Sequence, residues 1–314
     1  MHLSGLVRRR ASQLPAVLVG IVTVTFALVH LTPGDPARAL LTQKVTPQIL
    51  AQVRHELGED RPLLGQFFSY IGHVLTGNLG YSYRLGESVN SLVAARLPIT
   101  LFLVVYAGLL AILLGVPLAV IAATNVGRWP DKLTRVILMA SLAVPTFWIG
   151  VLFVKYLALD AGVFPVGGSG SGFVGHVGHL FLPALALSLT FLSVLVRSLR
   201  AVLIDVLGED YTAFARMKGI GRVQLYVRHV LRNALPPALT ILGLNMSYLL
   251  GASVIVESVF AINGVGYTLV SAVVSRDYQL VQGLALVFAL LVVAISLVVD
   301  LIQAALDPRR LAAG

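Results

Sequence analysis

The sequence predicts an all-α integral membrane protein with six transmembrane helices. A helical extracytoplasmic segment is expected between the first and second helices, and a cytoplasmic helical segment between the fourth and fifth. Three observations support this fold class. The 314 residues are 57% hydrophobic and only 12% charged, which is about half the charge of a soluble domain. The few charges are clustered, and the basic ones gather in alternate connecting segments.

Six windows contain no Asp, Glu, Lys or Arg, and each is at least 19 residues long. A helix needs about 20 apolar residues to cross the hydrocarbon core of a bilayer. A transmembrane barrel would show short segments of alternating polarity instead of continuous apolar runs. The six windows are residues 11–34, 97–127, 136–154, 161–196, 233–256 and 278–299.

The first window follows Arg8, Arg9 and Arg10, as the apolar core of a secretion signal would. Such cores are about 7–15 residues long and end at a small-residue cleavage site. The run from Leu14 to Thr32 is longer and shows no convincing site, so we expect a retained anchor. Two prolines and a glycine in the stretch 33–36 are expected to end this helix.

The formal net charge of +9 is explained by membrane topology rather than by nucleic-acid binding. If the N-terminus is cytoplasmic, 15 of the 23 basic residues fall in inside segments, as the positive-inside rule requires. Both termini are therefore predicted to be cytoplasmic. The chain has no cysteine, which excludes disulfides and thiolate metal ligands.

The segment 35–97 is predicted to form short helices outside the membrane. Proline, glycine and capping residues punctuate it, and turn residues occupy Gly77 to Gly80. The second transmembrane helix is then expected to begin at Pro98. The predicted short helices are 46–58, 63–75 and 88–96.

The rest of the chain is predicted to form five transmembrane helices, so the expected division is 1–34, 35–97 and a five-helix core at 98–314. Pro145 lies within the third helix and permits a kink there. Glycine-rich residues 162–178 and the stretch from Glu257 to Tyr278 are expected to be outer loops. Helices four, five and six are expected at about 181–196, 238–256 and 280–301.

The segment 198–236 is polar and basic, although apolar windows lie on both sides of it. Four apolar side chains recur at helical spacing, at Ile204, Leu207, Tyr211 and Phe214. A glycine turn at 219–221 and a second helix at 222–234 are expected to follow. An apolar stripe on an exposed helix usually marks a partner surface. The alternative is a basic loop that does no more than set topology.

Two motifs in this segment resemble the coupling loop of ABC-importer permeases. The first is Tyr211-x-x-x-Ala215-Arg216-x-Lys218-Gly219, and the second is Arg228-His229-x-x-Arg232-Asn233-Ala234-Leu235-x-Pro237. The chain departs from the general signature at Ala213-Phe214-Ala215, where an acidic residue usually precedes two alanines. Asn263 also replaces a proline that is common in relatives.

Further motifs along nearly the whole chain resemble the B-type permeases of dipeptide, oligopeptide and nickel importers. Single glycine motifs are weak evidence, but this many in order are strong. The motifs are Pro33-Gly34-Asp35-Pro36, Leu57-Gly58-x-Asp60-Arg61-Pro62-Leu63, Gly77-x-Leu79-Gly80-x-Ser82, Arg96-Leu97-Pro98-x-Thr100, Glu257-x-x-Phe260-x-x-x-Gly264-x-Gly266 and Arg276-Asp277-Tyr278-x-x-Val281-Gln282-Gly283.

This resemblance implies a permease in the bacterial inner (plasma) membrane that imports short peptides by alternating access. It implies four kinds of partner besides the lipid membrane: a second homologous permease, two cytoplasmic ATP-binding subunits and an extracytoplasmic substrate-binding protein. ATP and Mg would bind to the ATPase subunits, since this chain has no G-x-x-x-x-G-K-[ST] motif. We therefore expect no enzyme activity and no cofactor here. The residues expected to couple to the ATPase are Asp210, Tyr211, Ala213, Phe214, Ala215, Lys218, Gly219 and Arg228.

Four residues are candidates for the pathway or a gate: Asn245, Ser247, Glu257 and Phe260. Interhelical hydrogen bonds would explain the first two equally well, and a pairing with Arg276 would explain Glu257. No metal site is expected, although His176 and His179 were weighed as ligands because nickel is a family substrate. The alternative functions are import of nickel or another small solute and, with less support, a membrane enzyme or a channel.

Overall fold

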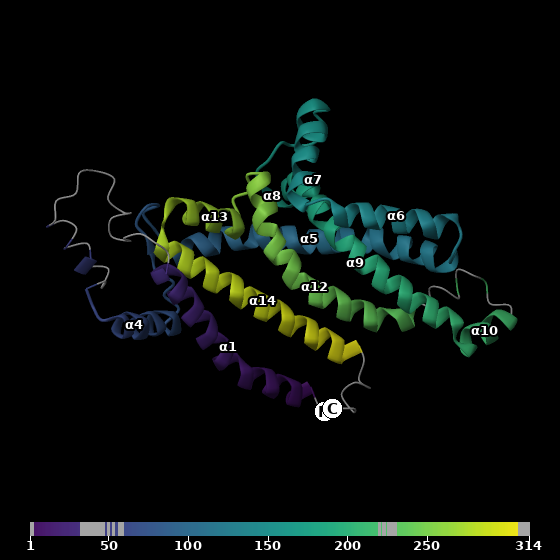
Figure 1. Ribbon diagram of the computed structural model, residues 1–314, viewed down its shortest axis with the longest axis horizontal. Helices are drawn as coiled ribbons and strands as arrows, with labels where there is room; N and C mark the ends of the chain where they lie inside the picture. Colours follow the sequence, from purple (N-terminus) through teal and green to yellow (C-terminus); the bar gives the residue numbers. More distant parts are fainter. Residues whose placement is uncertain are drawn as a thin grey trace. The chain divides into compact units, whose positions relative to one another are not determined.

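The computed structural model describes residues 3–31, 48, 51, 54–55, 60–218, 221, 224 and 231–306, and most of them are helical (Figure 1). One two-stranded sheet, β1 (Tyr81–Ser82) with β2 (Glu87–Ser88), interrupts the helices. The helices are α1 (Leu3–Leu31), α4 (Leu63–Leu75), α5 (Val89–Thr124), α6 (Trp129–Ala143), α7 (Thr146–Leu152), the π-helix η1 (Phe153–Asp160), α8 (Gly172–His179), α9 (Phe181–Gly208), α10 (Asp210–Met217), α12 (Leu231–Val259), α13 (Val265–Ser275) and α14 (Tyr278–Leu306).

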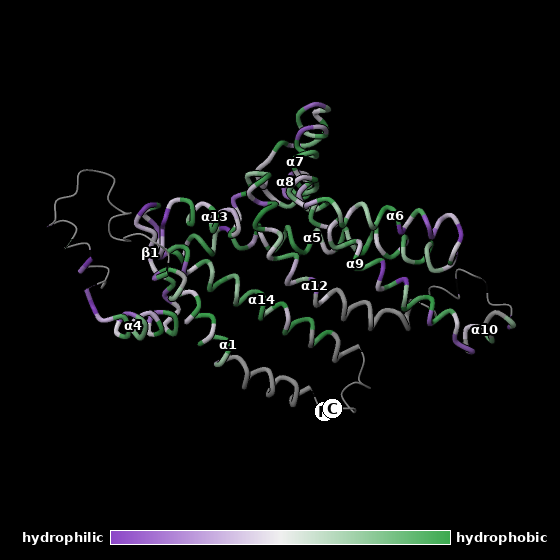
Figure 2. Tube along the Cα trace, in the orientation of Figure 1, coloured by the Kyte–Doolittle hydropathy of each residue, from purple (hydrophilic) through white to green (hydrophobic). Residues whose placement is uncertain are grey.

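The all-α membrane fold is confirmed, and helical residues, from one helix or from several, make up most of each of the six predicted windows. Three described helices are long and apolar enough to cross a bilayer: α5, α9 and the part of α14 from Tyr278 to Val299. A bent pair, α6 with α7 and η1, makes a fourth if it counts as one span. Figure 2 shows the apolar character of α5 and α14 along their described lengths. The count of six spans stays a prediction.

The chain divides into two compact units. The first comprises Thr100–Ile262 with the segments Met1–Leu3 and Ala294–Gly314. Within it α9 packs against α6, α7, α8, α10 and α12. The side chains along much of α9 are buried because neighbouring helices surround it. One apolar cluster of this unit consists of Ala119, Ala123, Leu138, Leu192, Val196, Leu199 and Leu203.

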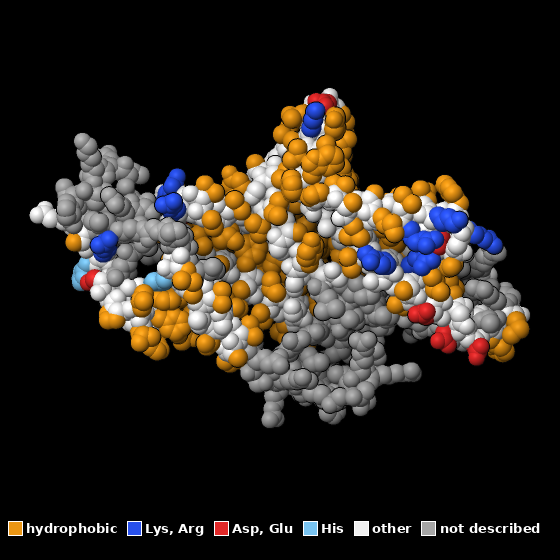
Figure 3. All heavy atoms as spheres, viewed as in Figure 1, with side chains coloured by type: hydrophobic (Ala, Val, Ile, Leu, Met, Phe, Trp, Pro, Cys, Tyr) orange, Lys and Arg blue, Asp and Glu red, His pale blue; other side chains and the backbone are white. Residues whose placement is uncertain are grey.

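The predicted kink at Pro145 is confirmed as a 97° bend between α6 and the α7–η1 pair. Proline has no backbone N–H, so the backbone hydrogen bonds of α6 stop before Pro145 and a new helix begins after it. In the new helix the amides of Trp148 and Ile149 both donate to the carbonyl of Pro145. A hydroxyl contact of 2.7 Å joins Thr146 to Thr190 of α9. Figure 3 shows hydrophobic side chains over the projecting α7–η1 segment.

The predicted boundary at Pro98 is wrong, because residues 89–124 form one continuous helix. An internal proline removes one backbone hydrogen bond. Burial of Val89 and Leu92 on the preceding turns stabilises the helix through that position.

The two predicted outer loops also contain helices. In the glycine-rich stretch, the two histidines of α8 hydrogen-bond to backbone carbonyls of the turn that precedes the helix. In the stretch after Glu257, α13 forms because its apolar residues Val265 and Ala272 are buried. Helix α9 continues twelve residues past the predicted end at 196, and α12 begins at Leu231, ahead of the predicted start.

The second unit comprises Ser4–Ile99 and Asn263–Val293. Its core contains Val89, Leu92, Val265, Ala272, Leu280 and Leu284. The predicted helix at 63–75 is confirmed as α4, which lies against α1. Contacts between them join Phe26 to Phe67 with ring centroids 5.2 Å apart, and Thr25 to Tyr70 at 3.2 Å. The predicted helix at 46–58 lies largely outside the described residues.

The strand pair brings together two motifs that are far apart in the sequence. The Ser82 hydroxyl donates to the Asp277 carboxylate at 2.5 Å, and both side chains are buried. The backbone amide of Tyr81 donates to the side chain of Gln279. The turn before β1 has a left-handed glycine at Gly80, with φ 101°. The motif around Gly77–Ser82 and the motif around Asp277–Gly283 are therefore parts of one structure within the second unit.

Candidate functional site

The candidate site is the C-terminal end of α9 together with α10, which we call the coupling segment (residues 198–218). Helix α9 becomes more polar towards this end (Figure 2). It ends at Gly208 and Glu209 takes an extended conformation, with φ −70° and ψ 144°. Thr212 then stabilises the corner, since its hydroxyl donates to the Val206 carbonyl at 2.7 Å and its amide to the Glu209 carbonyl. The result is a sharp change of direction between two helices.

The predicted apolar stripe is wrong as a single helical face, because the corner at 208–209 divides it. Ile204 and Leu207 lie on α9 and pack against the core of the first unit. Phe214 lies on α10 and is 56% exposed, beside Met217 at 78%. The Lys218 ammonium group lies 4.7 Å from the centre of the Phe214 ring. The coupling segment thus presents exposed apolar side chains on a short helix, and exposed apolar surface often marks a protein–protein interaction site.

Most of the other predicted coupling residues lie partly or wholly outside the described residues. Asp210 is exposed in the first turn of α10, where a carboxylate interacts favourably with the helix dipole. The backbone of Tyr211, Ala213 and Ala215 is helical, but their side chains lie outside the described residues. The positions of Gly219 and Arg228, the predicted turn at 219–221 and the predicted helix at 222–234 fall wholly or mainly outside the described residues as well.

A buried ion pair ties α9 to the connection between α5 and α6. The Asp131 side chain is fully buried at the start of α6. Arg200 of α9 donates two hydrogen bonds to its two carboxylate oxygens, at 2.8 and 2.9 Å. The Gly127 amide also donates to Asp131 at 2.9 Å, and Arg135 lies 3.3 Å away. We call this group the Asp131 clamp.

Sequence reasoning missed the Asp131 clamp. Its two arginines count toward the positive-inside pattern, and the sequence alone gives Asp131 no role. One signal was present, because Asp131 is the only acidic residue between Glu87 and Asp160. A lone carboxylate in a basic connection is a candidate for burial against a cation, since an unpaired buried charge is costly.

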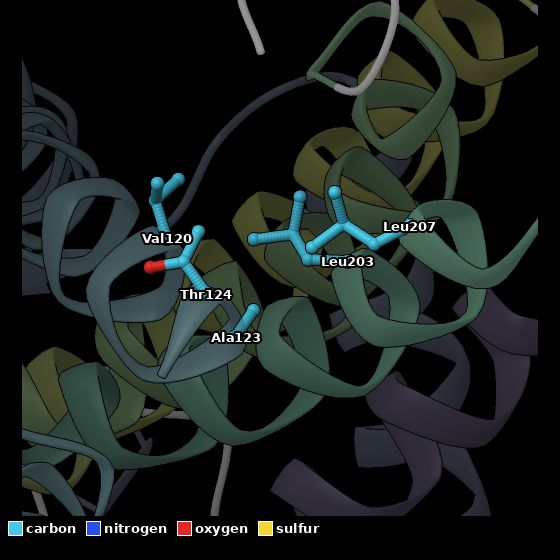
Figure 4. A pocket seen from close by; sticks show the side chains of 5 residues that line it. All are labelled: Val120, Ala123, Thr124, Leu203 and Leu207. Carbon is cyan, nitrogen blue, oxygen red and sulfur yellow. The ribbon is translucent and has the colours of Figure 1, made fainter. Parts of the chain in front are cut away.

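A small apolar groove lies between α5 and the coupling segment. Figure 4 shows its lining side chains, which come from the last turns of α5 and from α9. Its empty volume is about 120 Å³, whereas pockets for small molecules are usually about 300–1,000 Å³. The groove is therefore too small to be a peptide pathway. The lining residues are Val120, Ala123, Thr124, Leu203 and Leu207.

The predicted gate residues Glu257 and Phe260 lie at the C-terminal end of α12. Glu257 is fully buried and accepts a hydrogen bond of 2.7 Å from the Thr100 hydroxyl, which is also buried. Thr100 belongs to the Arg96–Thr100 motif and Glu257 to the Glu257–Gly266 motif, so a second pair of distant motifs meets here. This contact holds α5 to α12 within the first unit.

Phe260 is buried against glycines. Its side chain is 1% exposed, and a Cβ placed on Gly150 would lie 3.1 Å from its ring. Its carbonyl accepts a hydrogen bond from the Gly168 amide at 3.1 Å. Asn245 and Ser247 lie half-buried on α12. The pathway role of all four gate candidates stays a prediction.

The Gly167→Ala variant tests the packing around Phe260. An added Cβ at Gly167 would lie 2.4 Å from the Phe260 carbonyl oxygen, so the backbone must shift. We expect a loss of about 2 kcal/mol in the free energy of unfolding, seen as a lower melting temperature of the purified chain in detergent. Gly178→Ala is the control, because nothing lies within 4 Å of that position. Equal melting temperatures for the two variants would contradict the close contact.

The two histidines weighed as metal ligands make structural contacts. His176 Nδ1 lies 2.6 Å from the Ser169 carbonyl, and His179 Nδ1 lies 3.1 Å from the Gly167 carbonyl. A carbonyl only accepts, so each ring donates from Nδ1. Within the described part of the chain, no group of three or more His, Cys, Asp or Glu side chains is arranged to hold a metal ion.

Comparisons with known proteins complete the description of the site. Residues 115–311 match the family described as "Binding-protein-dependent transport system inner membrane component", and residues 2–104 match its N-terminal counterpart. The glutathione transport system permease protein GsiC of Salmonella typhimurium (strain LT2) is 37% identical over 306 residues, covering 98% of each chain. GsiC of Escherichia coli (strain K12) is 36% identical over the same length.

A solved structure shares the fold. It is an inward-facing conformation of the MetNI methionine ABC transporter, with a TM-score of 0.58 and 16% sequence identity. The match covers 69% of this chain and 96% of the other. At this level of identity the likeness concerns the fold alone.

Proposed function

Because this chain belongs to the family of binding-protein-dependent transport system inner membrane components, we propose that it imports short peptides by alternating access. The chain is a permease subunit of an ABC importer, and ATP is hydrolysed by a separate subunit.

One observation carries the coupling proposal: an exposed apolar surface stands at the end of a buried helix. Phe214 and Met217 are exposed on α10, while α9 packs against most of the helices of its unit. A force applied to α10 would therefore act on the centre of the helical core. An exposed apolar patch of this kind usually binds a partner.

The Asp131 clamp supports the same proposal. It links the coupling segment, through Arg200 of α9, to the connection between α5 and α6. A displacement of α9 would then carry the ends of α5 and α6 with it. A ligand-driven switch requires different contacts in its two states, so the ATPase must bind the coupling segment differently when ATP is bound and when it is not.

The proposed assembly contains four kinds of component besides the lipid membrane. Two cytoplasmic ATPase subunits, which bind ATP and Mg, contact the stretch 198–236, which includes the coupling segment. A second homologous permease completes the pathway, and a substrate-binding protein delivers cargo to the outer side. Both termini face the cytoplasm in this arrangement, and residues 35–97 lie outside. The basic residues that follow the positive-inside pattern support this orientation.

Short peptides are the proposed cargo because the GsiC relatives are named as glutathione permeases, and glutathione is a small peptide. Nickel or another small solute is the alternative that the family resemblance leaves open. The same kinds of subunit would be needed in either case. The substrate-binding protein would largely determine whether peptide or nickel is selected.

Uptake by proteoliposomes tests the function. The chain is reconstituted with its partner permease, ATPase subunits and binding protein, and ATP is supplied on the ATPase side. We expect ATP-dependent accumulation of labelled di- and tripeptides. Accumulation of nickel without peptides would show that nickel, and not peptide, is the cargo. Ion conductance by this chain alone would contradict the importer function. A Gly219→Asp variant that assembles normally is expected to lose both uptake and the stimulation of ATP hydrolysis.

A further inference from the structure

The first turns of α6 carry basic side chains on one exposed face. Lys132 and Arg135 are three residues apart on α6, which places them on the same side of the helix. Arg128 is the residue just before its first turn, and all three are exposed. The adjoining side of these turns is buried and carries Asp131, Thr134 and Leu138. The orientation of the cations on α6 is thus fixed by the packing of this buried side. We call the three cations the α6 basic face.

The α6 basic face has more positive charge than its neighbours neutralise. The buried Asp131 carboxylate is engaged by Arg200, and Arg135 lies 3.3 Å from it. Among the residues that the structure describes, no carboxylate lies within ion-pair distance of Arg128 or Lys132. Figure 3 shows Lys and Arg side chains gathered at this end of α6.

The surface next to these cations is apolar and begins with a tryptophan. Trp129 is 72% exposed, and tryptophan is enriched where membranes meet water because its ring is apolar and its N–H is polar. The exposed face then continues along α6 towards the bend at Pro145. The exposed apolar side chains on it are Leu133, Val136, Ile137 and Met139.

We propose that the α6 basic face binds the headgroup of an anionic phospholipid, with Trp129 at the interface and the acyl chains along the apolar face of α6. Charge complementarity favours this occupant, since a phosphodiester headgroup with a net negative charge meets Arg128 and Lys132, which have no carboxylate partner among the described residues. The apolar surface directly beyond the cations suits acyl chains, whereas a soluble acidic protein would meet it with polar groups. The assignment to the cytoplasmic leaflet rests on the orientation in the proposed function.

Fluorescence quenching tests this proposal on the full chain in liposomes. The chain has two tryptophans, so Trp148→Phe leaves Trp129 as its single reporter. The liposomes contain phosphatidylcholine and phosphatidylglycerol in one fixed ratio, and only one of the two lipids carries bromine. We expect stronger quenching when phosphatidylglycerol is brominated, with a preference of about five-fold at low salt for each of the two cations without a described carboxylate partner, Arg128 and Lys132. High salt should reduce this preference.

Substitutions assign the preference to particular residues. In the Trp148→Phe background, the double variant Arg128→Gln, Lys132→Gln should show equal quenching of Trp129 fluorescence by the two brominated lipids. An unchanged melting temperature should show that its fold is intact. The control, Arg84→Gln with Lys155→Gln, removes two exposed charges elsewhere and should keep the preference. Equal quenching by both lipids in the parent chain would overturn the proposal, as would a preference that survives the double substitution.

A protein partner at this face would give a different result. The lipid preference would then be absent, and the double substitution would instead reduce co-purification of the ATPase subunits. The quenching measurement needs neither transport nor ATP hydrolysis. A chain that selects the anionic lipid but fails to import peptide would therefore contradict the proposed function and support the lipid site. A chain that imports peptide without selecting the anionic lipid would support the proposed function and contradict the lipid site.

Discussion

Replacing Phe214 with serine is expected to abolish most peptide uptake while leaving the chain folded. The side chain is 56% exposed on α10, so the free energy of unfolding should change by less than about 0.5 kcal/mol. Loss of a central aromatic contact at an interface typically costs about 2 kcal/mol or more. We therefore expect binding of the ATPase subunits to weaken by roughly thirty-fold, measured by co-purification, with a matching fall in uptake by proteoliposomes.

The matched control is Val274→Ser on α13. Val274 is 79% exposed, so the change removes an apolar side chain of comparable exposure from a different helix. Uptake by this variant should equal that of the parent. Normal uptake by Phe214→Ser would contradict the coupling role of α10. Equal defects in both variants would show that the loss is not specific to the coupling segment.

The Asp131→Asn variant is expected to destabilise the chain more than any other single change considered for this protein. Removing one partner of a buried ion pair costs roughly 3–5 kcal/mol. Arg200 remains 22% exposed, so water relieves part of that cost and we expect about 3 kcal/mol. The amide has one acceptor oxygen where the carboxylate has two, and the two-point contact with Arg200 is lost. Thermal unfolding in detergent measures the effect.

Two further variants distinguish the Asp131 clamp from a general loss of charge. Arg135→Gln removes the more exposed and more distant cation and should cost less than about 1 kcal/mol. Asp131→Asn combined with Arg200→Gln should be less destabilised than the sum of its single changes, because neither charge is then left alone. An additive double variant would show that the two side chains do not interact energetically.

The same variants report on mechanism if they are stable enough to assemble. Loss of the Asp131 clamp should uncouple α9 from the connection between α5 and α6. ATP hydrolysis would then continue with little uptake, so the ratio of peptide imported to ATP hydrolysed should fall. A merely structural role would lower both quantities in proportion to the amount of folded protein.

The spans were the most predictable part of the fold. An apolar run near 20 residues long requires a helix in a bilayer because its backbone polar groups must bond internally. The kink at Pro145 was predictable for a similarly local reason, since proline lacks an N–H. The boundary at Pro98 was not, because burial of Val89 and Leu92 outweighs the bond that the proline removes. The helices within the supposed outer loops also depend on burial, as Val265 and Ala272 of α13 show.

The candidate site was predictable only as a stretch of sequence. The motif containing Phe214 marked the coupling segment, and the exposed position of this side chain agrees with a partner surface. The periodicity of the four apolar side chains suggested one helix. It did not reveal the corner at Glu209, because 3.6-residue spacing continues across it by chance. The Asp131 clamp was missed because the two residues are 69 positions apart.

The sequence by itself determined the class of fold, its membrane setting and the family, because composition, apolar run length and ordered motifs act locally. Only the tertiary structure decided which motifs meet. Ser82 pairs with Asp277 across 195 positions, and Thr100 pairs with Glu257 across 157. Each contact depends on how whole helices pack, and a buried hydroxyl or carboxylate must find its partner wherever that packing places one.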